Sequence, residues 1–325
     1  PSNSITLNAG TGDDIVNLDG LDDASGPNVF INGDGDTGGD TVNINFLSST
    51  TFGNLSIGAS GDVETITTEV AGLTLSSALI LEATGDITDD ASGRSLTFDV
   101  DSLLFDSGST GGSTTLDVTT NVGRARVDLG ANDLDFSSTG GLASNLVLIT
   151  DAGSITLSGS TIAGTNILFE ALGTTSNIDI NAALESTGAN ISLLADNDVT
   201  QNATGNITTN AGNIRVRADN DADNTGAIFM TNGSVTSATG GDIFYRAGGN
   251  LALSSLQASG NTVYVRSGAS ITDNGDGAID ILAADGIIIG AAGAGTSVNL
   301  LDTTLASLTG ETGSGGMFIN ETDGL

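Results

Sequence analysis

A five-residue pattern recurs along the chain and constrains its fold more than any other feature. Each copy has apolar residues at its first and third positions and Ala or Ser at its fifth. This alternation with period two indicates a β-strand. A second short strand is predicted eight residues after the start of five copies, at Ile87, Val199, Leu251, Ile271 and Ile287. The copies lie at residues 79–83, 167–171, 191–195, 214–218, 243–247, 263–267 and 279–283.

The spacing of the copies favours a solenoid. From residue 167 on, neighbouring copies begin 16 to 29 residues apart, which is the period of β-solenoids and too short for propeller blades. Two copies break the eight-residue offset, because the chain resumes at Ile178 in one and at Ile228 in the other. We predict that the extra residues, including the acidic stretch 219–224, lie in loops between strands.

The repeated pattern also carries a resemblance to a known family. An I-x-φ-x-A segment (φ being apolar) followed by a Gly/Asn/Asp turn and Ile-Thr or Val-Thr resembles the repeats of filamentous-haemagglutinin-type adhesins, giant bacterial surface proteins, over about residues 53–300. The resemblance implies an all-β, right-handed parallel β-solenoid (β-helix) forming an elongated rod. It also implies export to the cell surface and a role in adhesion, filaments or biofilm.

We expect three segments along the chain. Residues 1–52 form a Gly/Asp-rich, calcium-repeat-like start of the solenoid, and residues 53–308 form the solenoid repeats. Residues 309–325 are Gly-rich and then apolar from Met317 to Ile319, which suits a C-terminal cap or a docking segment for another rod. Self-association, end to end or side by side, is therefore an expected property of the chain.

Composition excludes most familiar active sites. The chain has no Cys and no His, so zinc fingers, haem ligation by His, Ser/His/Asp triads and Cys nucleophiles lack their ligands or bases. Its 40 acidic and 7 basic residues give a net charge of -33, the opposite of what sequence-independent nucleic-acid binding needs. We therefore predict a structural or adhesive module and not an enzyme.

A carbohydrate-active β-helix enzyme acting on acidic polysaccharide is the alternative. Paired carboxylates such as Asp22 with Asp23, or Asp89 with Asp90, could serve such a hydrolase. Pectin-active enzymes of this fold also carry His, Lys or Arg beside the acids, in motifs such as G-H-G and R-I-K. Neither motif occurs in this chain.

The sequence favours an extracellular location. No apolar run reaches the ~18 residues that span a bilayer, so no membrane span is expected. The start at Pro1 has neither an initiator Met nor a signal-like segment, and we interpret the chain as a processed or excised piece of a larger exported protein. We expect it to be secreted or displayed on a bacterial cell surface.

Calcium is a candidate ligand in two places. Residues 9–16 and 32–42 resemble the Gly-Asp nonapeptide repeats of calcium-binding toxins and adhesins, although both copies are imperfect. The acidic stretch 219–224 alternates carboxylates as a calcium loop does, but Asn224 and Met230 replace the Gly and Glu of a helix-loop-helix site. The candidate ligands are Asp14, Asp34, Asp36, Asp40, Asp219, Asp221 and Asp223.

Four of the seven arginines fall on one predicted outward stripe. The second and fourth positions of the pattern point outward when the first and third point inward. If the copies stack, like charges lie about 5 Å apart beside two aromatic rings. This combination suits acidic glycans or the acidic flank of a neighbouring rod, although the arginines can equally just moderate local negative charge. The stripe consists of Arg215, Arg217, Phe244, Arg246, Tyr264 and Arg266.

Overall fold

The computed structural model describes an all-β chain. Residues 145–275 and 277–324 are described continuously, and every regular element in the described residues is a β-strand. Contacts divide the chain into two compact units, Pro1–Gly153 and Ser154–Leu325. Among the described residues no helix is long and apolar enough to cross a membrane. The other described residues are 4–9, 12–18, 28–32, 41–46, 50–57, 65–70, 73–83, 87–89, 98–99, 102–107, 113–118, 125–128 and 133–138.

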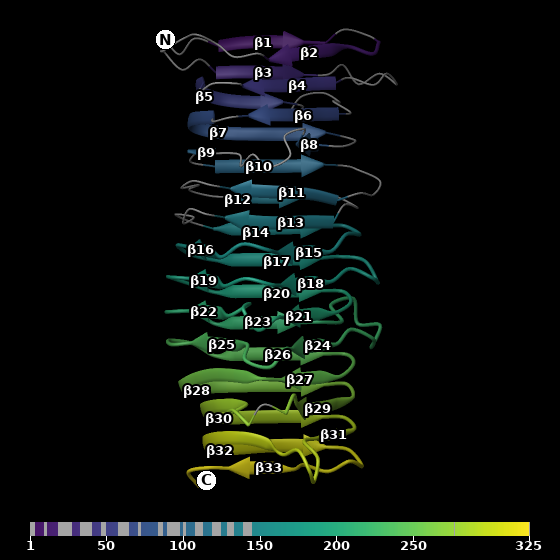
Figure 1. The fold of residues 1–325 in the computed structure, drawn as a ribbon, viewed down its shortest axis with the longest axis vertical. Helices are drawn as coiled ribbons and strands as arrows, with labels where there is room; N and C mark the ends of the chain where they lie inside the picture. The colour runs from purple at the N-terminus through teal and green to yellow at the C-terminus, as the bar shows by residue number, and fades with distance from the viewer. Residues whose placement is uncertain are drawn as a thin grey trace. The chain divides into compact units, whose positions relative to one another are not determined.

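The second unit is a parallel β-solenoid, which confirms the predicted all-β parallel solenoid, while its right-handed coiling stays a prediction (Figure 1). We call each complete turn of the chain a rung. A rung contains as many as three strands, and each strand pairs in parallel with its equivalent in the next rung. The first ladder contains β17 (Ile167–Ala171), β20 (Ile191–Ala195), β23 (Ile214–Arg217), β26 (Ile243–Ala247) and the later parts of β28 (Ser255–Ser267), β30 (Ile281–Gly290) and β32 (Leu301–Thr312).

Two further ladders complete each rung. The second ladder contains β15 (Ile155–Leu157), β18 (Ile178–Ile180), β21 (Val199–Gln201), β24 (Ile228–Met230), β27 (Leu251–Leu253), β29 (Ser270–Asp273) and β31 (Gly293–Ala294). The third contains β16 (Thr161–Ala163), β19 (Leu184–Ser186), β22 (Ile207–Thr209), β25 (Val235–Ala238), the early parts of β28, β30 and β32, and β33 (Ile319–Glu321).

The first unit is built from parallel strands in the same way. One set of its strands, from β1 to β14, pairs rung to rung, and β9 (Phe98–Asp99) pairs with the start of β7. That set is β1 (Ser4–Asn8), β3 (Asn28–Asn32), β5 (Thr50–Ile57), β7 (Leu73–Ala83), β10 (Ser102–Ser107), β12 (Ala125–Asp128) and β14 (Leu146–Thr150). The other strands are β2 (Ile15–Leu18), β4 (Thr41–Phe46), β6 (Thr65–Val70), β8 (Ile87–Asp89), β11 (Ser113–Val118) and β13 (Asp133–Ser138).

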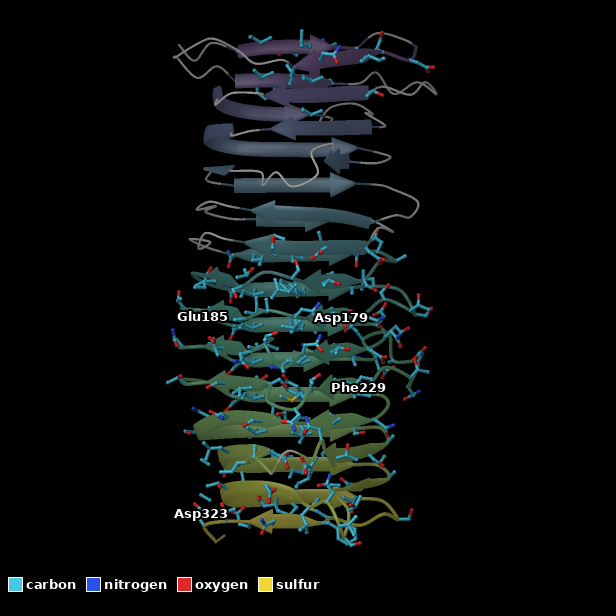
Figure 2. The ribbon with its side chains drawn as sticks, in the orientation of Figure 1. Asp179, Glu185, Phe229 and Asp323 are labelled. Atoms are coloured by element: carbon cyan, nitrogen blue, oxygen red, sulfur yellow. The ribbon has the colours of Figure 1, made fainter. Side chains whose placement is uncertain are left out.

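The period-two alternation in the sequence produces the core of the second unit. The first, third and fifth residues of β17, β20 and β26 are buried, whereas the second and fourth are more accessible. Ile191, Ile214 and Ile243 occupy one register position on consecutive rungs, and each is fully buried. Burying such a side chain contributes about 1.5–3 kcal/mol, so these aliphatic stacks provide much of the stabilisation. Polar side chains project from the outside of the ribbon (Figure 2).

Amide and carboxylate side chains connect the rungs at the corners. Asn190 Oδ1 accepts from the backbone N–H of Asn213, and Asn213 Oδ1 accepts from that of Asp242. Asp242 Oδ1 continues the series to the backbone N–H of Thr262. Asn190, Asn213 and Asp242 directly precede the first-ladder strands β20, β23 and β26. Thr262 directly precedes the first-ladder part of β28. Each bond contributes about 1 kcal/mol and satisfies a backbone N–H outside the strand pairing.

One predicted copy of the repeat is wrong. Residues 279–283 do not follow β26 and β28 on the first ladder, because Val263 pairs with Gly286. Ile281 pairs instead with Leu256 on the third ladder, and Ile287, predicted to start a second strand, pairs with Tyr264 on the first. The third and first ladders run together in the single strand β30, so this rung has no turn where the sequence pattern placed one.

The C-terminal segment continues the solenoid. Residues up to Thr312 belong to β32, and β33 adds a further parallel strand to the third ladder. Between them, Met317 forms a parallel bridge with Ala294 of β31. The segment predicted as a cap or docking element thus supplies a short last rung of the unit.

Candidate functional site

Successive rungs of the first ladder bring the predicted arginine–aromatic stripe together. Arg215 pairs with Phe244 and Phe244 with Tyr264, so these residues share one register position. Arg217 pairs with Arg246 and Arg246 with Arg266 at a second position two residues further along. We call Arg217, Arg246 and Arg266 the arginine column. The register predicted from sequence is correct for all six residues.

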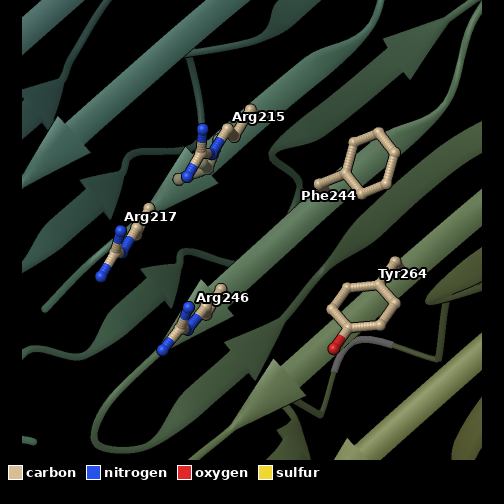
Figure 3. A pocket seen from close by; sticks show the side chains of 6 residues that line it. Arg215, Arg217, Phe244, Arg246 and Tyr264 are labelled. Atoms are coloured by element: carbon tan, nitrogen blue, oxygen red, sulfur yellow. The ribbon is translucent and has the colours of Figure 1, made fainter. Parts of the chain in front are cut away.

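The stripe lines a shallow groove of about 340 Å³ (Figure 3). The rings of Phe244 and Tyr264 lie on neighbouring strands with centroids 6.4 Å apart and planes tilted by 42°. This is within the range in which aromatic pairs attract each other. Arg266 continues the column but is not among the lining residues. Those residues are Arg215, Val216, Arg217, Phe244, Arg246 and Tyr264.

The positive charge in the groove is concentrated. Burial lowers the pKa of Arg217, and the charges of Arg246 and Arg215 lower it further, while the charges of Asp219 and Asp196 oppose this fall. Arg217 Nη2 donates to the carbonyl oxygen of Asp219 over 3.1 Å, while its buried Nε has no hydrogen-bond partner among the described residues. Within the same described part of the chain, none of the four guanidinium groups forms an ion pair. An anion in the groove would relieve this mutual repulsion.

The acidic loop after β23 gathers three carboxylates. Oxygens of Asp219, Asp221 and Asp223 all lie within 4.8 Å of one another, so the cluster could hold a metal ion. Asp219 is buried at the corner of its rung, whereas the other two are exposed. Met230 is a buried core residue of β24, which agrees with its exclusion as a ligand.

Unusual backbone conformations shape this loop. Asp219, Ala222 and Asn224 have φ values of 63°, 65° and 72°, in the left-handed region that few non-glycine residues adopt. Asp219 Oδ1 accepts from the Asn224 N–H over 2.6 Å and fixes the turn. Hydrogen bonds from the Thr225 hydroxyl and N–H lower the pKa of Asp223.

The N-terminal calcium candidates are mostly outside the described residues. Asp34, Asp36 and Asp40 all lie there, as do Asp22, Asp23 and Asp90 of the carboxylate pairs. Asp14 is described and partly buried, and its carbonyl oxygen accepts from the Thr41 N–H over 2.9 Å. The Gly-Asp calcium-repeat hypothesis therefore stays a prediction.

Other outward positions differ in character from the groove. On the second ladder, Asp179, Thr200 and Phe229 share one register position, and Phe229 is 43% exposed (Figure 2). Burial raises the pKa of Asp179, with Asp198 adding to the rise, while a hydrogen bond with Thr200 opposes it. These positions combine one carboxylate, one hydroxyl and one ring, without the clustering of like charge found in the groove.

The corner amides are structurally important residues that the sequence interpretation missed. A usable signal was present, because Asn or Asp directly precedes the apolar start of the copies at residues 167, 191, 214 and 243. No family model, curated protein or solved structure matches the chain.

Proposed function

We propose that this chain is a non-enzymatic structural or adhesive module of a bacterial cell-surface or extracellular filament protein, and that its groove binds an anionic partner. The observation that carries the proposal is the clustering of four of seven arginines beside two rings on a chain of net charge -33. Parallel ladders and stacked aliphatic residues suit a stiff spacer, which presents its outward positions to partners. Acidic glycans and acidic protein surfaces both match the chemistry of the groove.

Removing part of the arginine column should weaken anion binding. The double variant Arg246→Ser, Arg266→Ser should retain its far-UV circular dichroism spectrum, because both side chains are exposed. Its affinity for an acidic polysaccharide such as polygalacturonate should fall about tenfold, more at low salt, since two charged contacts are lost. Isothermal titration calorimetry measures the effect.

The matched control is Arg94→Ser, Arg124→Ser, which removes the same charge elsewhere in the sequence. Equal binding by the two double variants would show that the groove has no special role. A separate assay addresses the rival enzymatic function. Incubation with acidic polysaccharides and measurement of new reducing ends should give no turnover, and reproducible turnover would replace the structural proposal with a hydrolase.

Calcium is the cation we predict for the carboxylate cluster of Asp219, Asp221 and Asp223. Oxygen ligands from closely spaced Asp residues suit hard cations, and a ligand that binds only the folded state stabilises it. Millimolar calcium should therefore raise the melting temperature measured by calorimetry. The variant Asp221→Asn, Asp223→Asn should lose most of this increase.

General screening of the negative charge also stabilises the folded chain, so magnesium and sodium at matched ionic strength are the controls. Equal increases with all three cations, or an unchanged response in the double variant, would contradict a specific calcium site at this loop.

A further inference from the structure

The arginine column has an acidic counterpart within the same chain. In the first unit, Glu82 pairs with Asp106 and Asp106 pairs with Asp128, so three consecutive rungs carry an acidic residue at one register position. We call these three residues the acidic column. Each directly follows the register position of Leu81 and its equivalents, so it holds the fourth position of the five-residue pattern. The arginines hold that same fourth position in the second unit.

The two columns have the same length and the same repeat. Each contains three residues on three consecutive rungs, and parallel strands in a ladder lie about 4.8 Å apart. The spacing between charged residues is therefore the same in the basic column as in the acidic column. Each arginine can face one carboxylate without any change in backbone spacing. A second solenoid has this spacing, whereas a small free anion contacts one arginine at a time.

Apolar residues flank the arginine column on neighbouring rungs. Leu194 pairs with Arg217 on one side of the column, and Ile289 pairs with Arg266 on the other. Ile287, which pairs with Tyr264, is half-buried like Leu194 and Ile289, while Ile288 between them is fully buried. The first ladder thus has aliphatic and aromatic side chains on its accessible side beside the guanidinium groups. Interfaces between proteins combine aromatic residues and Arg in this way.

The acidic column has apolar neighbours of its own. Ile80 and Leu104 share one register position on two of its rungs, and Arg126 occupies that position on the third. In the five-residue pattern this is the second position, which Phe244 and Tyr264 hold in the second unit. On two of the three rungs in each set an apolar second position lies beside the charged fourth position, and an arginine, Arg126 or Arg215, holds the second position on the remaining rung.

We propose that the arginine column of one copy docks on the acidic column of a second copy, so that the solenoids associate side by side. This inference rests on the proposed function, since it assigns the anionic partner of the groove. Every copy carries both columns, so each copy can supply either side of the contact. The net charge of -33 on each copy opposes association at low ionic strength. At 0.15 M salt, charges beyond ~8 Å are screened, while the close column contacts persist.

Charge reversal and mixing test the proposal on the full chain. One variant carries Arg217→Glu, Arg246→Glu and Arg266→Glu, and the other carries Glu82→Arg, Asp106→Arg and Asp128→Arg. Sedimentation velocity at 0.15 M salt and up to roughly 100 µM protein should show concentration-dependent association of the unmodified chain. Each reversed variant alone should associate at least about tenfold more weakly, because three attractive pairs become repulsive. An equimolar mixture of the two variants should recover association, since the reversed columns again match.

The control reverses Asp13, Asp151 and Asp323 to Arg, which changes the net charge equally at exposed positions outside both columns. It should not restore association of the arginine-reversed variant. Circular dichroism and melting temperatures establish that each variant is folded. If the acid-reversed variant does not fold, the neutral set Glu82→Gln, Asp106→Asn, Asp128→Asn takes its place. A monomeric unmodified chain, or a mixture that stays monomeric, would overturn the inference. Polygalacturonate binding by that monomeric chain would leave the proposed function intact, and loss of that binding as well would remove both.

Discussion

Replacing Gly268 by Ala is expected to lower the free energy of unfolding by about 1–3 kcal/mol, because the added Cβ has no space in the rung before it. An ideal Cβ at Gly268 would lie 2.0 Å from the carbonyl oxygen of Gly248 and 2.9 Å from its carbonyl carbon. Both atoms belong to the backbone, so a side-chain rotation cannot relieve the overlap. The N–H of Gly268 also donates to the Ala247 carbonyl oxygen, which ties the two rungs together at this corner.

Urea-induced unfolding followed by circular dichroism measures the effect. The matched control is Gly233→Ala, where no atom lies within 4 Å of the added Cβ but φ is +87°. A left-handed conformation costs an L-residue about 1–2 kcal/mol, so the control separates backbone strain from close approach. If Gly268→Ala costs no more than Gly233→Ala, the two rungs are further apart at this corner than described.

Replacing Tyr245 by Ala should lower the free energy of unfolding by about 3–5 kcal/mol. Tyr245 is fully buried on the first ladder, and its hydroxyl lies 2.7 Å from Thr236 Oγ1. The hydroxyl also donates to Gln201 Oε1 over 3.1 Å, and Gln201 Nε2 donates to the Val235 carbonyl oxygen. The substitution therefore creates a cavity and also removes one member of a buried hydrogen-bond network. Tyr245→Phe keeps the ring and should cost only about 1–2 kcal/mol.

Tyr245 also makes stability depend on alkaline pH. Burial raises the pKa of Tyr245 above the ordinary value of 10.0, although its hydrogen bond with Thr236 opposes the rise. As pH rises through that ordinary value, the unfolded chain loses the tyrosine proton while the folded chain retains it. Stability from this group is therefore complete below pH ~10 and declines as pH rises toward the folded-state pKa. Urea midpoints from pH 8 to 11 should fall less steeply in Tyr245→Phe, and equal slopes would disprove this linkage.

The sequence predicted the ladders well because inward burial and strand alternation have the same period. Ile191, Ile214 and Ile243 are aligned as their shared pattern indicates. The register position of Arg217 follows because it lies three residues after Ile214 in the sequence. Local alternation cannot show where two strands merge, and this is why residue 279 was assigned to the wrong ladder. Ile279 is 38% exposed, and the segment matched the pattern because Ile279, Ile281 and Ala283 occupy its first, third and fifth positions.

The candidate sites were only partly predictable from sequence. Position in the repeat places a side chain on a ladder, so the arginine–aromatic stripe followed once the register was known. The alternating carboxylates of the acidic loop were also named from sequence, but the left-handed φ values of Asp219, Ala222 and Asn224 that shape the loop are encoded by no periodic signal. The third ladder was missed because its strands are short, as in Thr161–Ala163 and Leu184–Ser186, and mix apolar residues with Ser or Thr.

The corner amides couple each rung only to its immediate neighbours in the solenoid. The bonds from Asn190 to the Asn213 N–H and from Asn213 to the Asp242 N–H join only adjacent rungs. Folding free energy in such an array is a sum of module and nearest-neighbour terms, as in a one-dimensional chain of coupled units. Gain or loss of one whole rung during evolution preserves every remaining coupling, whereas a one-residue insertion within a strand reverses its inward and outward faces. Selection can therefore adjust the length of the protein in steps of about one rung without redesigning its interior.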